Sequence, residues 1–204
     1  GSSGRSFTLA VGIPIAAARL AQLSHAPHFS IFWNNLMEPD LSRLPPAFTA
    51  YAVSNWPAAS SLTTADGNDM LQKGMFDVGF VSGAQIDRYG NTNITAIGDY
   101  RRPKVRLVGS LAQPELLAFP HKPLCVVDLN KRVFVERVDY ITGVGYLRGY
   151  ESRTEAGLKP LSDYKIMTDK GVFGFHTETK EMTLLSLHAG STIEDVQANM
   201  SFAP

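Results

Sequence analysis

Residues 83–93, Gly-Ala-Gln-Ile-Asp-Arg-Tyr-Gly-Asn-Thr-Asn, form the densest group of polar side chains that could do chemistry. They follow the apolar run Val78–Val81, which predicts a short strand. Open α/β sheets bind ligands at polar turns just past the carboxyl ends of strands. The alternative is an ordinary β-turn, in which Asp87 and Asn91 bond nearby backbone amides and Gly90 supplies a positive φ. The residues alone leave both interpretations open.

Other reactive residue types give weaker signals. Cys125 is the single cysteine and lies in an apolar run, which predicts a buried core residue in a reducing, cytoplasmic setting. His25 and His28 are separated by a helix-breaking proline and lack carboxylate or thiol neighbours at ligand spacing, so we expect no metal site. The glycines at 143, 145 and 149 have the wrong spacing for a dinucleotide-binding loop.

Composition narrows the class of protein. The chain has 204 residues, 44% of them apolar, and a formal net charge of zero. These values predict one globular domain over residues 1–204, without general attraction to nucleic acid or anionic membranes. A basic patch at Arg101, Arg102, Lys104 and Arg106 has no recognition motif beside it. No apolar run reaches the roughly 18 residues of a membrane span, and no signal peptide is visible.

The elements that must position these residues follow a strand–helix–strand pattern. Residues 7–11 and 29–33 read as strands, and residues 15–23, rich in Ala, Leu and Arg, read as the helix between them. This order predicts a βαβ crossover and a parallel sheet. Residues 34–55 carry three prolines and read as a long loop. Further strands are predicted at 78–81, 106–108, 124–127 and 133–138.

The C-terminal part predicts a different pairing. Residues 164–168, 172–175 and 182–187 are short apolar runs separated by turns, which indicates an antiparallel meander. Residues 192–198 predict a short helix capped at its amino end. We therefore expect an α/β fold with an open, mainly parallel sheet and an antiparallel C-terminal portion. Residues 1–4 read as an artificial leader or a loop, and we expect a chain trimmed at both ends.

Several motifs in fixed order resemble the β subunit of glutaconate CoA-transferase, a family I CoA-transferase, over residues 5–204. The β subunit of CoA-ester ring-opening hydrolases is also similar, at residues 131–145. The motifs are residues 83–93, Ile97-Gly98-Asp99-Tyr100, Pro103-Lys104, Lys131-Arg132-Val133-Phe134, Val138-Asp139-Tyr140-Ile141-Thr142 and Thr168-Asp169-Lys170-Gly171.

The resemblance implies a sheet of the CoA-transferase type and a similar α-type partner subunit, in a heterodimer or an α2β2 assembly. It implies an acyl-CoA substrate, with coenzyme A as part of the substrate and no covalently bound cofactor. It also implies a mechanism in which a β-subunit glutamate attacks the acyl-CoA carbonyl to give an anhydride. The CoA thiolate then attacks the glutamyl carbonyl, giving an enzyme–CoA thioester.

Two departures from the family concern the residues that would do this chemistry. Counting from Ala26-Pro27 places the family glutamate position at Asn34, and Glu38 is the nearest carboxylate in the same loop. An amide cannot form the anhydride at a useful rate, but it can donate a hydrogen bond to an oxyanion.

The second departure is in a glycine-rich loop. The family sequence Gly-Ser-Gly-Gly is Gly109-Ser110-Leu111-Ala112 here, and we expect Leu111 not to adopt a positive φ readily. The resemblance makes this loop, together with Gly83, Ala84 and Gln85, the expected CoA-ester binding region.

Three functions stay open. The first is an acyl-CoA enzyme subunit that uses Asn34 for carbon–carbon cleavage or decarboxylation. The second is a true CoA-transferase in which Glu38 replaces the missing glutamate. The third is a non-catalytic scaffold or acyl-CoA-binding subunit.

Overall fold

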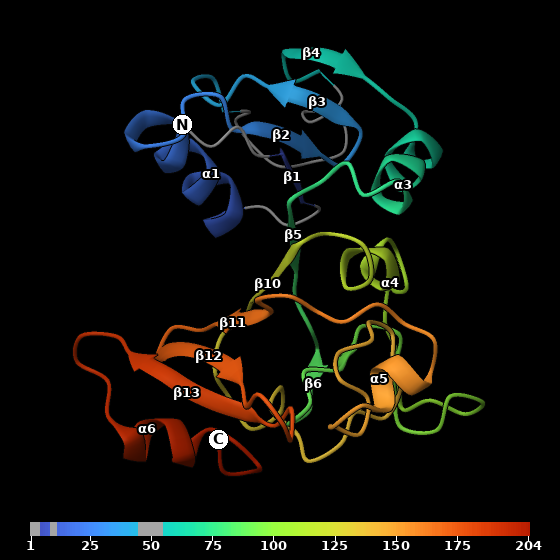
Figure 1. The fold of residues 1–204 in the computed structure, drawn as a ribbon, viewed down its shortest axis with the longest axis vertical. Coiled ribbons are helices and arrows are strands. Elements are labelled where there is room, and N and C mark those ends of the chain that lie inside the picture. Colours follow the sequence, from blue (N-terminus) through green and yellow to red (C-terminus); the bar gives the residue numbers. More distant parts are fainter. Residues whose placement is uncertain (1–4, 9–11, 45–54) are drawn as a thin grey trace.

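The fold is built on a nine-stranded mixed sheet (Figure 1). The structure is a computed structural model, and it describes residues 5–8, 12–44 and 55–204. Its strand order is β13-β12-β11-β10-β5-β1-β2-β3-β4. The five central strands are parallel, and all other pairings in the sheet are antiparallel. The predicted α/β class and antiparallel C-terminal portion are confirmed.

The parallel strands are β1 Arg5–Thr8, β2 Ser30–Trp33, β5 Val78–Val81, β10 Lys122–Val126 and β11 Lys165–Met167. The antiparallel strands are β3 Leu36–Pro39, β4 Ala58–Ser61, β12 Gly171–Phe175 and β13 Met182–Leu187. Two small hairpins pair β6 Gln85–Ile86 with β7 Thr92–Asn93 and β8 Ala96–Ile97 with β9 Val105–Arg106. The helices are α1 Ile13–Ser24, α3 Thr64–Gln72, α4 Gln113–Leu116, α5 Ser152–Glu155 and α6 Ile193–Ala198.

Strand β2 is buried on both faces, as a central parallel strand must be. Its side chains alternate, and they divide between two hydrophobic clusters. Ile31 and Trp33 belong to the cluster that contains Ile15 of α1. Phe32 belongs to the larger cluster that contains Leu71 of α3. The two helices therefore cover opposite faces of β2.

Local sequence explains where the helices begin. Gly12 has a φ of 81° before α1, and a proline occupies the first turn of that helix, where its missing N–H costs nothing. Thr63 and Thr192 each open a capping box, with Asp66 and Asp195 three residues later.

The structure corrects two sequence predictions. Residues 34–55 are not simply a loop, because β2 turns at once into the antiparallel strand β3; residues 45–54 of that prediction lie outside the described residues. Residues 133–138 do not form a strand. The Asn130 side chain accepts the amides of Arg132 and Val133 and bends the chain into a turn. Only Phe134 makes a bridge there, to Ile86.

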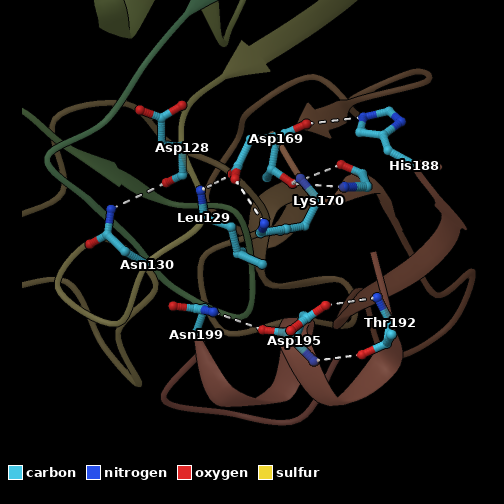
Figure 2. A network of polar contacts seen from close by, with 11 residues as sticks. Asp128, Leu129, Asn130, Asp169, Lys170, His188, Thr192, Asp195 and Asn199 are labelled. Atoms are coloured by element: carbon cyan, nitrogen blue, oxygen red, sulfur yellow. Dashed lines mark hydrogen bonds and ion pairs between the residues drawn. The ribbon is translucent and has the colours of Figure 1, made fainter. Parts of the chain in front are cut away.

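The loops after β10 and β11 are bonded to one another and pack near the C-terminal elements (Figure 2). Leu129 donates its amide to Asp169 at 2.8 Å, and the His188 ring lies 3.0 Å from the Thr168 carbonyl. The same view shows α6 held by its Thr192–Asp195 cap. Polar groups thus tie the loops after β10 and β11 to each other and to the end of β13, whereas the cap of α6 is made within the first turn of that helix.

Candidate functional site

The carboxyl edge of the parallel strands brings the predicted site segments to one side of the sheet. Phe80 of β5 and Trp33 of β2 are both level with Thr8 of β1, which lies between them. Asn34, the residue after Trp33, is therefore level with Val81, the residue after Phe80. Residues 82–85 begin one position further along the chain. Two inter-strand spacings separate Asn34 from that segment, roughly 10 Å.

Asn34 lies at the tip of the β2–β3 turn. Its side chain is exposed, and its φ of 57° is a conformation that asparagine tolerates better than most residues. The side-chain Nδ2 donates to the Asn35 Oδ1 at 3.3 Å, and Asn35 in turn donates to Ser61 Oγ. The amide is thus lightly held at the strand end, where a second acceptor can reach it.

Glu38 lies elsewhere. Because Met37 pairs with Phe32, Glu38 of β3 is level with Ile31, about three residues or roughly 10 Å back from Asn34. Its carboxylate accepts a hydrogen bond from Ser30 Oγ and lies 3.4 Å from the Ile31 amide. The carboxylate is therefore held near the beginning of β2, away from the strand tip.

The segment Gly83, Ala84 and Gln85 begins the excursion that leaves β5. Ala84 donates its amide to Asn93, and the buried Gln85 side chain is fully engaged. Gln85 Oε1 accepts from Asn93 Nδ2 at 2.8 Å and from the Asp139 amide at 3.0 Å, and its Nε2 donates to the Asp139 carboxylate. Gln85 joins segments of the fold, which leaves Gly83 and Ala84 as the part of this segment that a ligand can approach.

The loop Gly109, Ser110, Leu111 and Ala112 lies against the same excursion. Gly109 donates its amide to Ile94 at 2.7 Å, and a Cβ there would come within 2.5 Å of the Ile94 carbonyl. Ser110 and Leu111 are exposed. Leu111 has a φ of 51°, contrary to the expectation that it would avoid the left-handed region. The fold therefore imposes a glycine-like backbone on a residue that retains a bulky side chain.

Gln113 is a site residue that sequence reasoning missed. Its side chain is buried, and Nε2 donates to the Ser82 carbonyl at 2.7 Å and to Thr92 Oγ1 at 2.6 Å. It thereby fastens the 109–112 loop to the end of β5. The sequence signal that could have found this residue is a glutamine directly after the 109–112 loop, at the start of a helix that has no capping side chain.

Asp87 and Asn91 form a closed network of hydrogen bonds. Asp87 accepts from the Tyr89 amide and from both the backbone and side chain of Asn91. Asn91 Oδ1 accepts the amides of Gly145 and Leu147, and a Cβ at Gly145 would come within 2.4 Å of the 89–90 backbone. The turn interpretation therefore describes these two residues, which hold the 143–147 segment in place.

Burial dominates the electrostatics of this region. Removal from water raises the pKa of Asp87 above its usual value, although its hydrogen bonds act in the opposite direction. Burial also raises the pKa of Cys125 to about 12, so the thiol is an inert core residue as predicted. Among the described residues, no three His, Cys, Asp or Glu side chains gather as metal ligands would, and none of the described helices has the length and hydropathy of a membrane span.

A cleft of ≈ 1160 Å³ opens on the outer side of the Asp87 turn. It is lined by Tyr89, Tyr140, Arg137 and Arg148, among others. Arg88 on its wall is already paired with Glu136 and with Glu181. Asp87, Arg88, Tyr89 and Asn91 of the 83–93 segment line this cleft, whereas Asn34, Glu38, residues 83–85 and residues 109–112 do not.

Comparison with known proteins gives a consistent result. A protein-family model described as Coenzyme A transferase matches residues 3–199. The chain is 32% identical to the β-type subunit of 3-oxoadipate CoA-transferase from Pseudomonas knackmussii, over 98% of this chain and 78% of that protein. It is 30% identical to a cholesterol ring-cleaving hydrolase IpdB subunit of Rhodococcus jostii, over 93% of this chain and 71% of that protein.

The fold is similar to a solved structure as well. The crystal structure of glutaconate coenzyme A-transferase from Acidaminococcus fermentans superimposes with a TM-score of 0.84. The superposition covers 98% of this chain and 78% of that one, at 28% sequence identity.

Proposed function

Because the chain belongs to the coenzyme A transferase family, as a β-type subunit, we propose that it completes an α/β enzyme acting on acyl-CoA thioesters without forming a glutamyl anhydride. The observation that carries this proposal is the carboxamide of Asn34 at the carboxyl end of β2, together with a Glu38 carboxylate held near the other end of that strand. We propose Asn34 as the residue that contacts the thioester.

The chemistry of an amide at this point suits carbon–carbon cleavage or decarboxylation. In hydrolytic cleavage of a β-keto acyl-CoA, water adds to the β-ketone, the bond between the α and β carbons breaks, and its electron pair moves onto the thioester carbonyl oxygen as an enolate that is then protonated. In decarboxylation of an unsaturated dicarboxylic acyl-CoA, the bond to the departing carbon dioxide breaks, and its electron pair reaches the same oxygen through the conjugated double bond before a proton is taken up. A hydrogen-bond donor at that oxygen stabilises the developing charge, whereas a carboxylate would repel it. The Asn34 Nδ2 group, exposed and bonded only weakly to Asn35, is such a donor.

The relatives support two reaction classes. The similarity to a ring-cleaving hydrolase subunit favours cleavage of a carbon–carbon bond in the proposed enzyme. The similarity to a 3-oxoadipate CoA-transferase subunit favours the second candidate, ordinary acyl exchange. That candidate needs Glu38 to leave Ser30 and reach the strand tip, or a carboxylate from the α-type partner.

Mass spectrometry of acyl-CoA turnover separates these candidates. The chain would be co-expressed with its α-type partner, and the complex incubated with β-keto and unsaturated dicarboxylic acyl-CoA thioesters. We expect loss of carbon dioxide or gain of water. Exchange of the acyl group onto an added acid, with a carboxylate that hydroxylamine or borohydride modifies in the presence of acyl-CoA, would establish the transferase instead.

A matched pair of variants tests the proposed role of Asn34. Asn34→Asp keeps the shape and the tolerance of positive φ but replaces the donor with a carboxylate, so we expect turnover to fall roughly 100-fold. Asn35→Asp alters the neighbouring residue of the same turn and should change turnover less than about threefold. If Asn34→Asp retains wild-type turnover, the chain serves its complex as a scaffold and the proposal is wrong.

A further inference from the structure

The β8–β9 hairpin, residues 96–106, presents an uncompensated group of positive charges. Arg101, Arg102, Lys104 and Arg106 are exposed, and none of them forms an ion pair within the described part of the chain. The one acidic residue of the hairpin, Asp99, accepts the backbone amide of Arg101 at 2.7 Å. The protein as a whole is neutral, so this concentration of charge is a local feature.

An aromatic platform accompanies the charges. The Tyr100 ring stacks on Tyr140 with centroids 5.0 Å apart and an interplanar angle of 22°. The Arg106 guanidinium lies 4.8 Å from the Tyr100 centroid and donates to the Tyr100 carbonyl. Tyr100 remains 51% exposed. Tyr140 and the Arg106 guanidinium both lie against this ring, so the exposed part of Tyr100 offers a nucleobase an apolar contact at the ring edge beside the arginines.

The hairpin is fixed to the body of the protein. Gly98, with a φ of 84°, donates its amide to the Asp139 carboxylate at 2.9 Å. The same Asp139 carboxylate accepts from Gln85, which follows the candidate site residues Gly83 and Ala84. Lys104 donates its amide to Ile97 and closes the turn. The basic side chains therefore project from a backbone that is held in position before any ligand arrives.

The hairpin also leads directly into the site. Gly109 follows Lys104 by five positions, a span of at most roughly 17 Å. That reach is comparable to the extended pantetheine arm that joins the thioester of an acyl-CoA to its nucleotide. The nucleotide end carries three phosphate groups and an adenine, which match a group of Arg and Lys side chains beside an aromatic ring.

From this arrangement we infer that the β8–β9 hairpin binds the 3′-phosphorylated ADP end of the CoA thioester. Arg101, Arg102 and Lys104 contact its phosphates, and Tyr100 packs against its adenine. The acyl end then extends past residues 109–112 to Asn34. This inference rests on the proposed function, because it assumes an acyl-CoA ligand, and it assigns the residues that select the ligand's nucleotide.

Calorimetric titration of the purified protein, with any subunit that co-purifies, tests the inference using free CoA and 3′-dephospho-CoA as probes. We expect the R101A/R102A double variant to bind CoA roughly tenfold or more weakly. The K131A/R132A variant removes two adjacent exposed cations from another loop and should bind CoA as the wild type does. The wild type should prefer CoA over dephospho-CoA, and R101A/R102A should lose that preference.

The outcomes distinguish two failures. If the wild type binds CoA and R101A/R102A binds it equally well, the hairpin assignment is wrong while the proposed function stands. The same conclusion follows if R101A/R102A loses a co-purifying subunit but retains its CoA affinity, which would make the hairpin a subunit contact. If the wild type binds no CoA, the proposed function itself fails.

Discussion

Asp87 shows how a polar residue in a site-like motif can serve the fold. It is 4% exposed, and the groups that approach it are the amides of Tyr89, Asn91 and Val138 and the Asn91 side chain. Asn91 carries the connection onward to Leu147, 56 residues away. A carboxylate so surrounded by donors contributes to stability through the bonds it accepts, and its loss leaves those donors unsatisfied.

We expect Asp87→Asn to lower the free energy of unfolding by about 2–4 kcal/mol at neutral pH, because the new NH2 group faces donors. Urea denaturation followed by circular dichroism measures the change. Asp69→Asn, which removes one partner of the exposed Asp69–Lys73 pair, should cost less than about 1 kcal/mol. Equal losses in the two variants would contradict the assigned role of Asp87.

The pH dependence of this loss follows from the direction of the pKa shift. Burial raises the native pKa of Asp87, so between the unfolded and native pKa values the native state binds more protons than the unfolded state. The contribution of Asp87 to stability therefore falls as pH rises through that window. The difference in unfolding free energy between wild type and Asp87→Asn should be largest near pH 4, shrink with rising pH and then become constant. A difference that grows with pH would show a lowered pKa instead.

At the scale of elements, Arg153 of α5 joins three separate segments. Its buried guanidinium donates to the carbonyls of Leu117, at the end of α4, and of Val144, Gly145 and Lys159. No carboxylate pairs with it among the described residues. Burial lowers the pKa of Arg153, while its hydrogen bonds to carbonyls replace those lost with water.

We expect Arg153→Met to cost about 3 kcal/mol or more of unfolding free energy, because four carbonyls lose their donor while the side-chain volume is nearly kept. Since Leu117 ends α4, the 109–112 loop at its other end should also loosen, which amide hydrogen exchange would detect. Arg148→Met, an exposed position, is the control and should change stability by less than about 0.5 kcal/mol. Unchanged hydrogen exchange of the 109–112 amides in Arg153→Met would show that Arg153 does not hold the candidate site in place.

At the scale of the whole molecule, the sheet confines the candidate site to one part of its carboxyl edge. The loop after β10 is bonded to the loop after β11, and that loop is bonded to His188 after β13, whereas the ends of β5 and β2 carry the loops with Gly83 and Asn34. Val108 and Leu111 are 80% and 61% exposed beside that part of the edge. Apolar side chains in such a position are typical of a surface that a second subunit covers.

We expect the chain to co-purify with an α-type subunit of the same family in equimolar amounts, and size-exclusion chromatography with light scattering would measure the mass of the complex. Val108→Glu together with Leu111→Glu should weaken that complex if these residues lie in the contact. Leu185→Glu, exposed on the distant strand β13, is the control. Isolation of the chain as a monomer from cells that express both genes would contradict the heteromeric assignment.

The sequence by itself determined the local features. The apolar runs predicted β2, β5, β10 and the C-terminal meander, and Pro14 marked the start of α1, because these signals depend on neighbouring residues. It also indicated Asn34 at the end of a strand. Strands β3 and β4 were missed, because their prolines and small residues give no local strand signal. Pairing between residues far apart in the sequence stabilises these two strands at the edge of the sheet.

Only the tertiary structure decided which polar residues of the motif remain available to a ligand. Gln85 bonds Asp139 and Asn91 bonds Leu147 across more than fifty residues, and Gln113 reaches back to Ser82. A sequence shows which groups can donate and accept, but the pairing depends on distances that exist only after the chain has folded. For the same reason Leu111 has a positive φ and Glu38 lies near the beginning of β2, because in each case surrounding contacts override the local preference.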